Sequence, residues 1–262
     1  MPRYSAAGLC LIVTCMGRLA FVKRTLPRLL ATNARVCLVD YSCPDSSGDW
    51  AEREFSREFR AGQLEVVRIP GQTIFHKPAA LNAGARRGIE LAADYLAFLD
   101  ADTVLLPGFE AWLNGAVAPD RFLISLTGKS LFGFLATPTA AFARFGGYDE
   151  SIQGYGAEDI EMRLRLYLRG GLCYGWAPPN VLRSIAHDDE LRARHYRGQD
   201  IRANNAGNLA DVRARVRQWI GRDLWECGPD VTRLYHVDPE HPPPRGPALV
   251  TPFVRDATPG DG

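Results

Sequence analysis

The chain has 262 residues, of which 46% are hydrophobic and 23% charged, and its formal net charge is +1 at pH 7. Such a composition is that of an ordinary soluble globular protein with room for one large domain. A net charge near zero excludes the basic footprint of a nucleic-acid-binding protein, so no nucleic-acid partner is expected. The arginine-rich segment 192–222 is only a weak candidate for peripheral membrane association.

The six cysteines contain no Cys-x-x-Cys pair and no regular spacing. We therefore expect buried free thiols in a reducing cytosol, and the spacing supports neither a zinc site nor a nucleophilic cysteine. The apolar run after Arg3 lacks a small-x-small cleavage site and is too short to span a bilayer, so it is interpreted as a first β-strand. A cytoplasmic location is expected.

Strand and helix patterns alternate over the first hundred residues. Short apolar runs predict strands at 9–15, 36–39, 64–69 and 95–99. Helical spacing predicts a helix after the first strand, kinked or restarted at Pro27, and another that begins at Pro78. This alternation predicts right-handed crossovers and a mostly parallel sheet.

Polar residues stand at the carboxyl ends of three of these strands: Thr14, Asp40, and the pair Asp100 and Asp102. Ligands of open α/β sheets gather at this edge. An isolated Asp-x-Asp is more often a solvated acidic turn, but two hard oxygen ligands here also suit Mg²⁺ or Mn²⁺ shared with phosphates. The chain has no glycine-rich dinucleotide fingerprint and no phosphate loop, so a metal is expected to hold the phosphates.

From Phe122 the pattern changes, with strands predicted at 122–126 and 131–136 and then a glycine-rich loop over 146–156. The helix after this loop has Glu158 and Asp159 in its first turn. Acids there complement the helix dipole, or a carboxylate on a glycine-hinged loop serves as a general base.

The last third of the chain offers fewer signals. His187 and His195 lie within 181–196, and a lone histidine is more often a surface or core residue than a ligand. A terminal helix is predicted at 211–219. The proline-rich stretch 229–262 is interpreted as an extended, partly disordered tail.

Taken together, these segments resemble the nucleotide-sugar glycosyltransferases of the GT-A fold, most closely the β-1,4-galactosyltransferase and chondroitin-polymerase-like enzymes (family 2 and the galactosyltransferase carboxyl-terminal region). The resemblance covers about residues 8–200. GQTIFHKPAALNAGA resembles the Phe-x-Arg…Asn-x-Gly segment that helps hold UDP in that family. Its matching positions here are Phe75, Lys77, Asn82 and Gly84.

Three further motifs follow in the family's order. FLDAD resembles the family's Asp-x-Asp, which implies that Asp102 is a metal ligand, and His187 matches the late histidine that completes the metal site. GGYDESIQGYGAEDIE resembles the Gly-Gly-Phe…Trp-Gly-x-Glu-Asp segment and puts Asp159 on the position of the catalytic base. Singly the Asp-x-Asp and the histidine are weak signals, whereas the glycine-rich block is specific.

Three positions depart from the family. Lys77 replaces an arginine, so bidentate phosphate contact becomes a point-charge contact. Tyr155 replaces a tryptophan that contacts the sugar and gates the site. Asp40 stands alone where many relatives have two adjacent acids. These departures leave the donor sugar and the acceptor open.

The resemblance implies an α/β protein of the GT-A class: a Rossmann-like, mostly parallel central sheet flanked by helices, with a carboxyl-terminal acceptor-side subregion. The expected organisation is one domain over 1–228, with a nucleotide-binding half at 8–106 and an acceptor and catalytic half at 107–228, followed by the tail.

The implied activity is metal-dependent, inverting transfer of a hexose or N-acetylhexosamine from a UDP-sugar, with UDP-Gal or UDP-GalNAc favoured. The acceptor would be a hydroxyl of a glycan, a lipid-linked glycan or a small molecule, and the cation Mn²⁺ or Mg²⁺. Two alternatives stay open: a sugar nucleotidyltransferase, and a non-catalytic module that binds sugar nucleotides or glycans.

The residue roles follow from the same resemblance. Asp159 would take the proton of the attacking hydroxyl while Glu158 orients the acceptor. Thr14 and Asp40 would bind uridine. The remaining expected roles are those of Asp102 and His187 as metal ligands, Asp100 as metal support or ribose partner, Phe75, Lys77 and Asn82 as donor-binding residues, and Tyr155 as the residue that closes over the donor.

Overall fold

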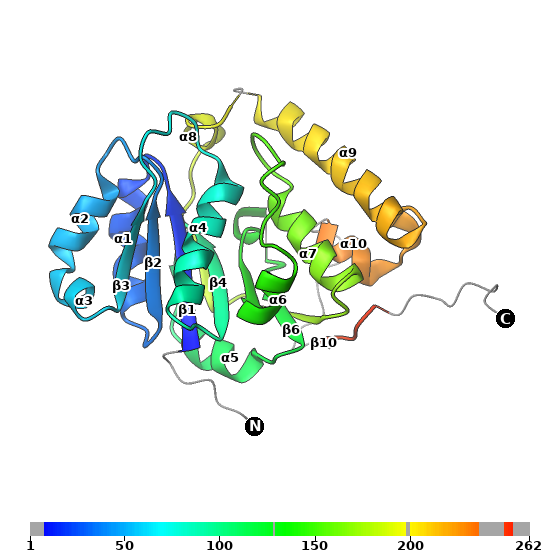
Figure 1. The fold of residues 1–262 in the computed structure, drawn as a ribbon, viewed down its shortest axis with the longest axis horizontal. Coiled ribbons are helices and arrows are strands. Elements are labelled where there is room, and N and C mark those ends of the chain that lie inside the picture. Colours follow the sequence, from blue (N-terminus) through cyan, green and yellow to red (C-terminus); the bar gives the residue numbers. More distant parts are fainter. Residues whose placement is uncertain (1–7, 128, 198–199, 236–248, 254–262) are drawn as a thin grey trace.

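The computed structural model describes residues 8–127, 129–197, 200–235 and 249–253. Within these ranges the chain forms an eight-stranded sheet with helices on both faces (Figure 1). The sheet order is β10-β8-β6-β7-β4-β1-β2-β3. Its strands are β1 (Leu9–Cys15), β2 (Arg35–Asp40), β3 (Leu64–Arg68), β4 (Tyr95–Asp100), β6 (Arg121–Ile124), β7 (Leu135–Pro138), β8 (Cys173–Trp176) and β10 (Leu249–Val250).

The position of β1 at the centre of the sheet explains why residues 9–15 are almost entirely apolar. It pairs in parallel with β2 on one side and β4 on the other, and all seven of its residues are buried. A strand covered on both faces and both edges has no solvent-facing position for a polar residue. The register sets Thr14 beside Val39 of β2 and beside Asp100 of β4, so the polar ends of these strands meet at one edge of the sheet.

The helices fall into two layers. On one face, α4 (Lys77–Glu90), α6 (Thr139–Arg144) and α7 (Glu158–Leu168) share a hydrophobic core with Ile12, Val39 and Phe98 of the sheet. On the other face, α1 (Leu19–Leu30), α2 (Ser47–Glu54) and α5 (Phe109–Ala116) pack against Leu11, Val13 and their neighbours. The short α3 (Ser56–Arg60) follows α2. This doubly wound arrangement confirms the α/β class predicted from the sequence.

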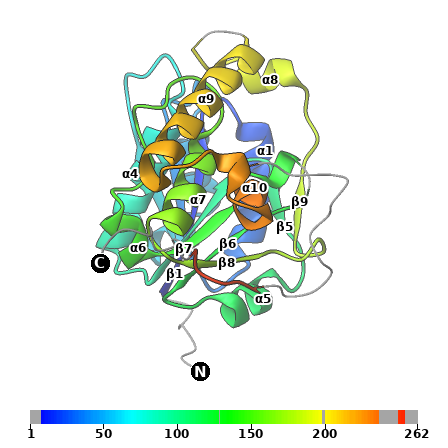
Figure 2. The ribbon, with the colours of Figure 1, turned by 90° about the vertical axis from the view of Figure 1, so that its right-hand side faces the viewer.

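The carboxyl-terminal third adds a cover over α7. Helix α9 (Ile201–Ile220) crosses in front of α7, and α10 (Pro229–Tyr235) also contacts it (Figure 2). Helix α8 (Asp189–Ala193) precedes α9. A separate antiparallel pair joins β5 (Thr103–Leu105) to β9 (Leu182–Ser184).

Several sequence-based element boundaries need correction. Helix α1 is one element that continues through Pro27, so no second helix starts there. The strand expected at 131–136 begins only at Leu135, after a 3₁₀ turn at Lys129–Leu131. The helix expected at 211–219 is the second half of α9.

The tail expected from residue 229 is wrong for its first residues. Pro229–Tyr235 is the helix α10, because proline fits a first helical turn and Val231 and Leu234, three residues apart, are both buried. Leu249–Val250 pairs with β8 as an edge strand. Residues 236–248 and 254–262 of the expected tail lie outside the described residues. No helix within the described ranges has both the length and the apolar character needed to cross a membrane.

Candidate active site

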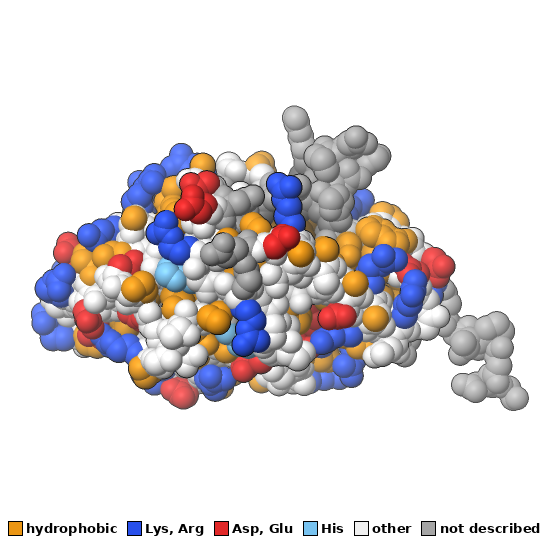
Figure 3. Space-filling model, turned by 90° about the horizontal axis from the view of Figure 1, so that it is seen from above, with side chains coloured by type: hydrophobic (Ala, Val, Ile, Leu, Met, Phe, Trp, Pro, Cys, Tyr) orange, Lys and Arg blue, Asp and Glu red, His pale blue; other side chains and the backbone are white. Residues whose placement is uncertain are grey.

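A cavity of about 410 Å³ opens at the carboxyl edge of β1 and β4. Its other walls come from the start of α4, the loop into α7, the segment after β9 and the inner side of α9. Figure 3 looks down on this side of the molecule, where basic, acidic and hydrophobic side chains are interspersed. Nine of the residues singled out from the sequence line the cavity: Thr14, Phe75, Lys77, Asp100, Asp102, Tyr155, Glu158, Asp159 and His187.

The ammonium group of Lys77 joins three carboxylates inside this cavity. Lys77 Nζ lies 3.0 Å from Asp100 Oδ1, 2.9 Å from Glu158 Oε1 and 3.2 Å from Asp159 Oδ2. The Lys77 side chain is only 12% exposed. Burial lowers its pKa, but the three carboxylates outweigh burial and raise that pKa well above its ordinary value. Lys77, at the start of α4, is therefore a permanent cation among three acids that β4 and α7 deliver.

Asp159 has one bound and one unbound carboxylate oxygen. Its Oδ2 contacts Lys77, whereas its buried Oδ1 has no hydrogen-bond partner among the described residues. Burial raises the pKa of Asp159 well above its ordinary value; the Lys77 charge opposes this effect, and Glu158 and Asp100 add to it. Asp159 lines the cavity, and a buried carboxylate with an unpartnered oxygen and a raised pKa is suited to accept a proton from a hydroxyl group.

Beside this cluster, Asp102 and His187 form a pair. His187 Nε2 lies 3.4 Å from Asp102 Oδ2, and the Ser184 hydroxyl donates to the same oxygen at 2.7 Å. The β5–β9 pairing, which sets Thr103 opposite Ser184, brings these distant segments together. Burial and the Asp100 charge raise the pKa of Asp102.

The residues expected to hold a metal meet that expectation only in part. Among the described residues, no group of three His, Cys, Asp or Glu side chains is placed to hold an ion. Asp100 is engaged by Lys77 and not by the Asp102–His187 pair. One carboxylate and one imidazole nevertheless fit a cation that takes its other ligands from a diphosphate and water, as Mg²⁺ and Mn²⁺ sites commonly do.

The rings of Phe75, Tyr155 and Tyr196 also line the cavity. Phe75 makes edge contacts with Tyr41 and Tyr196, with ring centroids 5.5 and 5.4 Å apart, and Tyr196 contacts Tyr155 at 5.3 Å. Tyr155 lies between Gly154 and Gly156, both with positive φ. The Phe75 and Tyr155 positions are thus connected through Tyr196, which the sequence did not single out.

Two residues expected to bind the donor do not line this cavity. The Asp40 carboxylate accepts hydrogen bonds from the backbone N–H groups of Cys43 and Gly48, both at 2.7 Å. The Asn82 side chain donates to the carbonyl of Tyr148 and accepts from its N–H, at 2.9 and 2.8 Å. Both side chains are occupied in holding loops, so the structure brings neither to this cavity.

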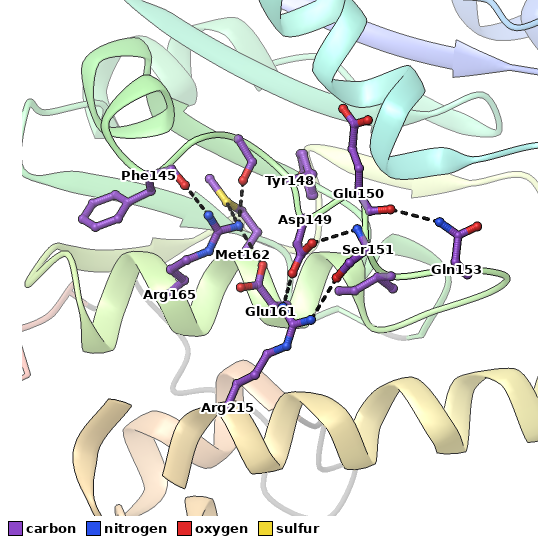
Figure 4. Close-up of polar contacts among 12 residues, drawn as sticks. Phe145, Tyr148, Asp149, Glu150, Ser151, Gln153, Glu161, Met162, Arg165 and Arg215 are labelled. Carbon is purple, nitrogen blue, oxygen red and sulfur yellow. Dashed lines mark hydrogen bonds and ion pairs between the residues drawn. The ribbon is translucent and has the colours of Figure 1, made fainter. Parts of the chain in front are cut away.

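Side chains of α7 and α9 also hold the Gly-Gly-Tyr-Asp-Glu segment, residues 146–150, in place (Figure 4). Arg165 of α7 donates to the carbonyls of Phe145 and Gly147, the latter at 2.6 Å. Arg215 of α9 pairs with Asp149 and donates to Ser151 at 3.0 Å. With the contact from Asn82, three helices fix the start of the loop that leads to Glu158 and Asp159.

The end of that loop is held by Asn208 of α9. The Asn208 amide donates to the carbonyls of Gln153, Tyr155 and Gly156 at 2.9, 3.2 and 3.0 Å. Immediately afterwards Ala157 adopts a φ of +73° as the N-cap of α7. Neither Asn208 nor Ser184 was found from the sequence, because a polar residue in a polar segment gives no signal of its partner.

No family model matches this sequence, and no curated protein matches it. Among solved structures, the crystal structure of S. aureus TarS matches with a TM-score of 0.54 at 12% identity, over 80% of this chain and 40% of that one. The complex of S. aureus TarS 1-349 with UDP gives 0.43 at 14% identity over 65% and 61%. Mannose-1-phosphate geranyltransferase from Thermus thermophilus gives 0.38 at 11% identity over 53% and 59%.

The chain thus spans 40–61% of the length of these three structures. At these identities the likeness concerns the fold alone. It rests on the TarS structure that matches with a TM-score of 0.54. The central, mostly parallel sheet flanked by helices is that of the Rossmann-like GT-A class.

Proposed function

We propose that this protein is an inverting glycosyltransferase that uses a nucleotide sugar. The observation that carries the proposal is the pair of oxygens on Asp159: one is bound to Lys77 and the other, Oδ1, is buried beside the cavity without a partner among the described residues. The fold likeness and the position of the cavity at the carboxyl edge of the sheet support a nucleotide-sugar substrate.

The residues divide the work between donor and acceptor. Lys77 would place its positive charge against the donor diphosphate, which competes with the three carboxylates for the ammonium protons. Asp159 would accept the proton of the attacking hydroxyl, and Glu158 would orient the acceptor. Tyr155 would cover the donor and exclude water.

Asp102 and His187 are the residues that would hold a divalent cation, Mn²⁺ or Mg²⁺, with Ser184 orienting Asp102. When bound, such a cation supplies positive charge that stabilises the departing diphosphate. UDP-Gal and UDP-GalNAc are the favoured donors, on the sequence resemblance. The acceptor class proposed is a hydroxyl of a glycan, a lipid-linked glycan or a small molecule.

The first test is thermal unfolding with UDP or GDP, each with and without Mn²⁺. A ligand at a hundred times its Kd stabilises by about 2.7 kcal/mol, which for a protein of this size is a shift of roughly 5–10 °C. We expect a shift that needs UDP and Mn²⁺ together and that Asp102→Ala abolishes. Asp120→Ala, an exposed acid outside the cavity, is the matched control and should keep the shift.

The second test separates catalysis from binding. Asp159→Asn removes the proton acceptor with little change of shape, so it should keep nucleotide binding and lose sugar transfer in a screen of UDP-sugars and acceptors. Absence of a shift with either nucleotide would refute the nucleotide-sugar proposal. A shift without transfer for any donor, in the wild type, would favour a binding module.

A further inference from the structure

Two cysteine thiols lie in contact beside the cavity, and one of them, that of Cys15, lines it. Cys15 is the last residue of β1, and Cys43 lies in the turn after β2. Their sulfur atoms are 3.2 Å apart, and the Cys43 thiol lies 3.1 Å from the Cys15 carbonyl, to which it donates. Nothing in the sequence pairs them, since 28 positions separate them and no Cys-x-x-Cys spacing occurs.

The backbone holds the two thiols against each other. Cys15 pairs in register with Asp40, and the N–H of Tyr41 donates to the Cys15 carbonyl at 3.0 Å. The Asp40 carboxylate then fixes the N–H of Cys43. Asp40, expected to bind uridine, therefore sets the turn that carries Cys43 over Cys15.

The distance of 3.2 Å between the two sulfur atoms leaves only a short movement to a disulfide. A disulfide bond is about 2.05 Å long, so the two sulfur atoms need to approach by about 1.2 Å. A side-chain rotation and a small adjustment of the turn after β2 supply a movement of this size. Cys15 is 1% exposed, whereas Cys43 is partly exposed and within reach of a small reagent.

We propose that Cys15 and Cys43 are a modification site at which a low-molecular-weight disulfide, such as glutathione disulfide, forms a reversible intramolecular disulfide. The Cys43 thiolate attacks the reagent, forms a mixed disulfide and releases one glutathione thiolate. The Cys15 thiolate then attacks the Cys43 sulfur and releases the second. The two protons lost by the protein thiols end on the two glutathione molecules, so the protein is oxidised by two electrons and the reagent is reduced.

The order of these steps follows from the environments of the two thiols. The hydrogen bond with Cys43 and burial both raise the pKa of Cys15, which makes it slow to react with an external reagent. Cys15 also lines the cavity, as do Met16 and Arg18 after it. The bond would therefore join this part of the cavity wall to the turn after β2.

Intact mass and peptide mapping after incubation with glutathione disulfide test the site. The wild-type protein should lose about 2 Da, with a Cys15–Cys43 crosslinked peptide, and dithiothreitol should reverse the loss. Cys15→Ser should stop at a glutathione adduct on Cys43, and Cys43→Ser should leave Cys15 unmodified. Cys227→Ser, which removes a partly exposed thiol outside the cavity, should still lose about 2 Da.

A wild-type protein that retains its full mass, or whose crosslink joins other cysteines, overturns the proposal. This readout needs no substrate and does not rest on the proposed function. A protein that binds UDP but forms no Cys15–Cys43 bond would refute the modification site alone, and the reverse result would refute the nucleotide site alone.

Discussion

Lys77 reaches Asp159 across 82 positions of sequence and holds one of its carboxylate oxygens at 3.2 Å. The same ammonium also contacts Asp100 and Glu158, so the start of α4, the end of β4 and the start of α7 meet at one positive charge. A lysine ammonium has three protons, one for each carboxylate. A diphosphate that draws on this charge would loosen the hold on Asp159, which couples donor binding to release of the proposed base.

The first prediction concerns removal of that charge. Lys77→Met leaves three neighbouring carboxylates without their cation, and breaking a buried ion pair by removing one partner costs about 3–5 kcal/mol. We expect a fall of this size in the free energy of unfolding at pH 7, measured by urea denaturation, together with loss of the UDP-dependent shift. Lys77→Arg, which keeps the charge, should lose much less stability. Equal losses in both variants would show that side-chain shape and not charge matters here.

The second prediction concerns the loop that carries Tyr155. Asn208→Ala removes an amide that donates to three loop carbonyls, and it should lower the free energy of unfolding by about 1–2 kcal/mol. Limited proteolysis should then cut faster between Gln153 and Gly156. The neighbouring Gly207→Ala has open space around its new methyl group and should raise stability by about 0.5–1 kcal/mol. Unchanged cleavage in Asn208→Ala would mean that the three hydrogen bonds do not hold the loop.

The parts of this fold that could be predicted are the elements whose burial leaves a recognisable apolar pattern in the sequence. A strand such as β1, buried on both faces, is apolar over almost all of its length. A polar residue near the end of such a strand, such as Thr14 in β1 or Asp100 in β4, is then conspicuous. Helix α7 was predicted from the helical spacing of Ile160, Leu164, Tyr167 and Leu168 after the glycine-rich loop, and all four residues are buried. The site roles of Glu158 and Asp159 came from the resemblance, and in the structure both residues line the cavity.

The features that could not be predicted depend on contacts between residues that are far apart in the sequence. In helix α9 only Val212 and Val216 are buried. The apolar spacing therefore predicted a helix over 211–219 alone, about half of the length that the structure shows. Whether a carboxylate at a strand end faces a ligand or its own turn depends on local backbone geometry, which separates Asp100 from Asp40. The contact of Cys15 with Cys43 requires the register of β1 and β2, which no short motif encodes.

The third prediction concerns Gly84, which the resemblance placed in a donor-binding motif. A Cβ atom at this position would lie 2.4 Å from Ile12 Cγ2 and 2.9 Å from Val39 Cγ2, so the glycine lets α4 lie close against β1 and β2. Gly84→Ala overpacks this contact and should cost about 1–3 kcal/mol in the free energy of unfolding. Gly207→Ala, in a helix with open space, is again the control. A stabilised Gly84→Ala would contradict the close packing.

The fourth prediction is a dependence of stability on pH through Asp149. Burial raises the pKa of Asp149, but hydrogen bonds from Arg215 and Ser151 outweigh it and lower that pKa from 3.8 to about 2. A carboxyl group with a lowered folded-state pKa stabilises the protein above its ordinary pKa. That stability is lost as the pH falls through the folded-state value. The carboxylate is 25% exposed, so its contribution is discounted for solvent screening to about 1–2 kcal/mol.

We therefore expect Asp149→Asn to be less stable than the wild type by this amount at pH 7, and the difference to shrink between pH 4 and pH 2. Urea denaturation at pH 7, 4, 3 and 2 measures it. Asp230→Asn, which removes an exposed pair with Arg233 on α10, should change stability by less than about 0.5 kcal/mol. A deficit in Asp149→Asn that stays constant down to pH 2 would assign the effect to the shape of the loop, since titration of Asp149 would then contribute nothing to its attachment to α9.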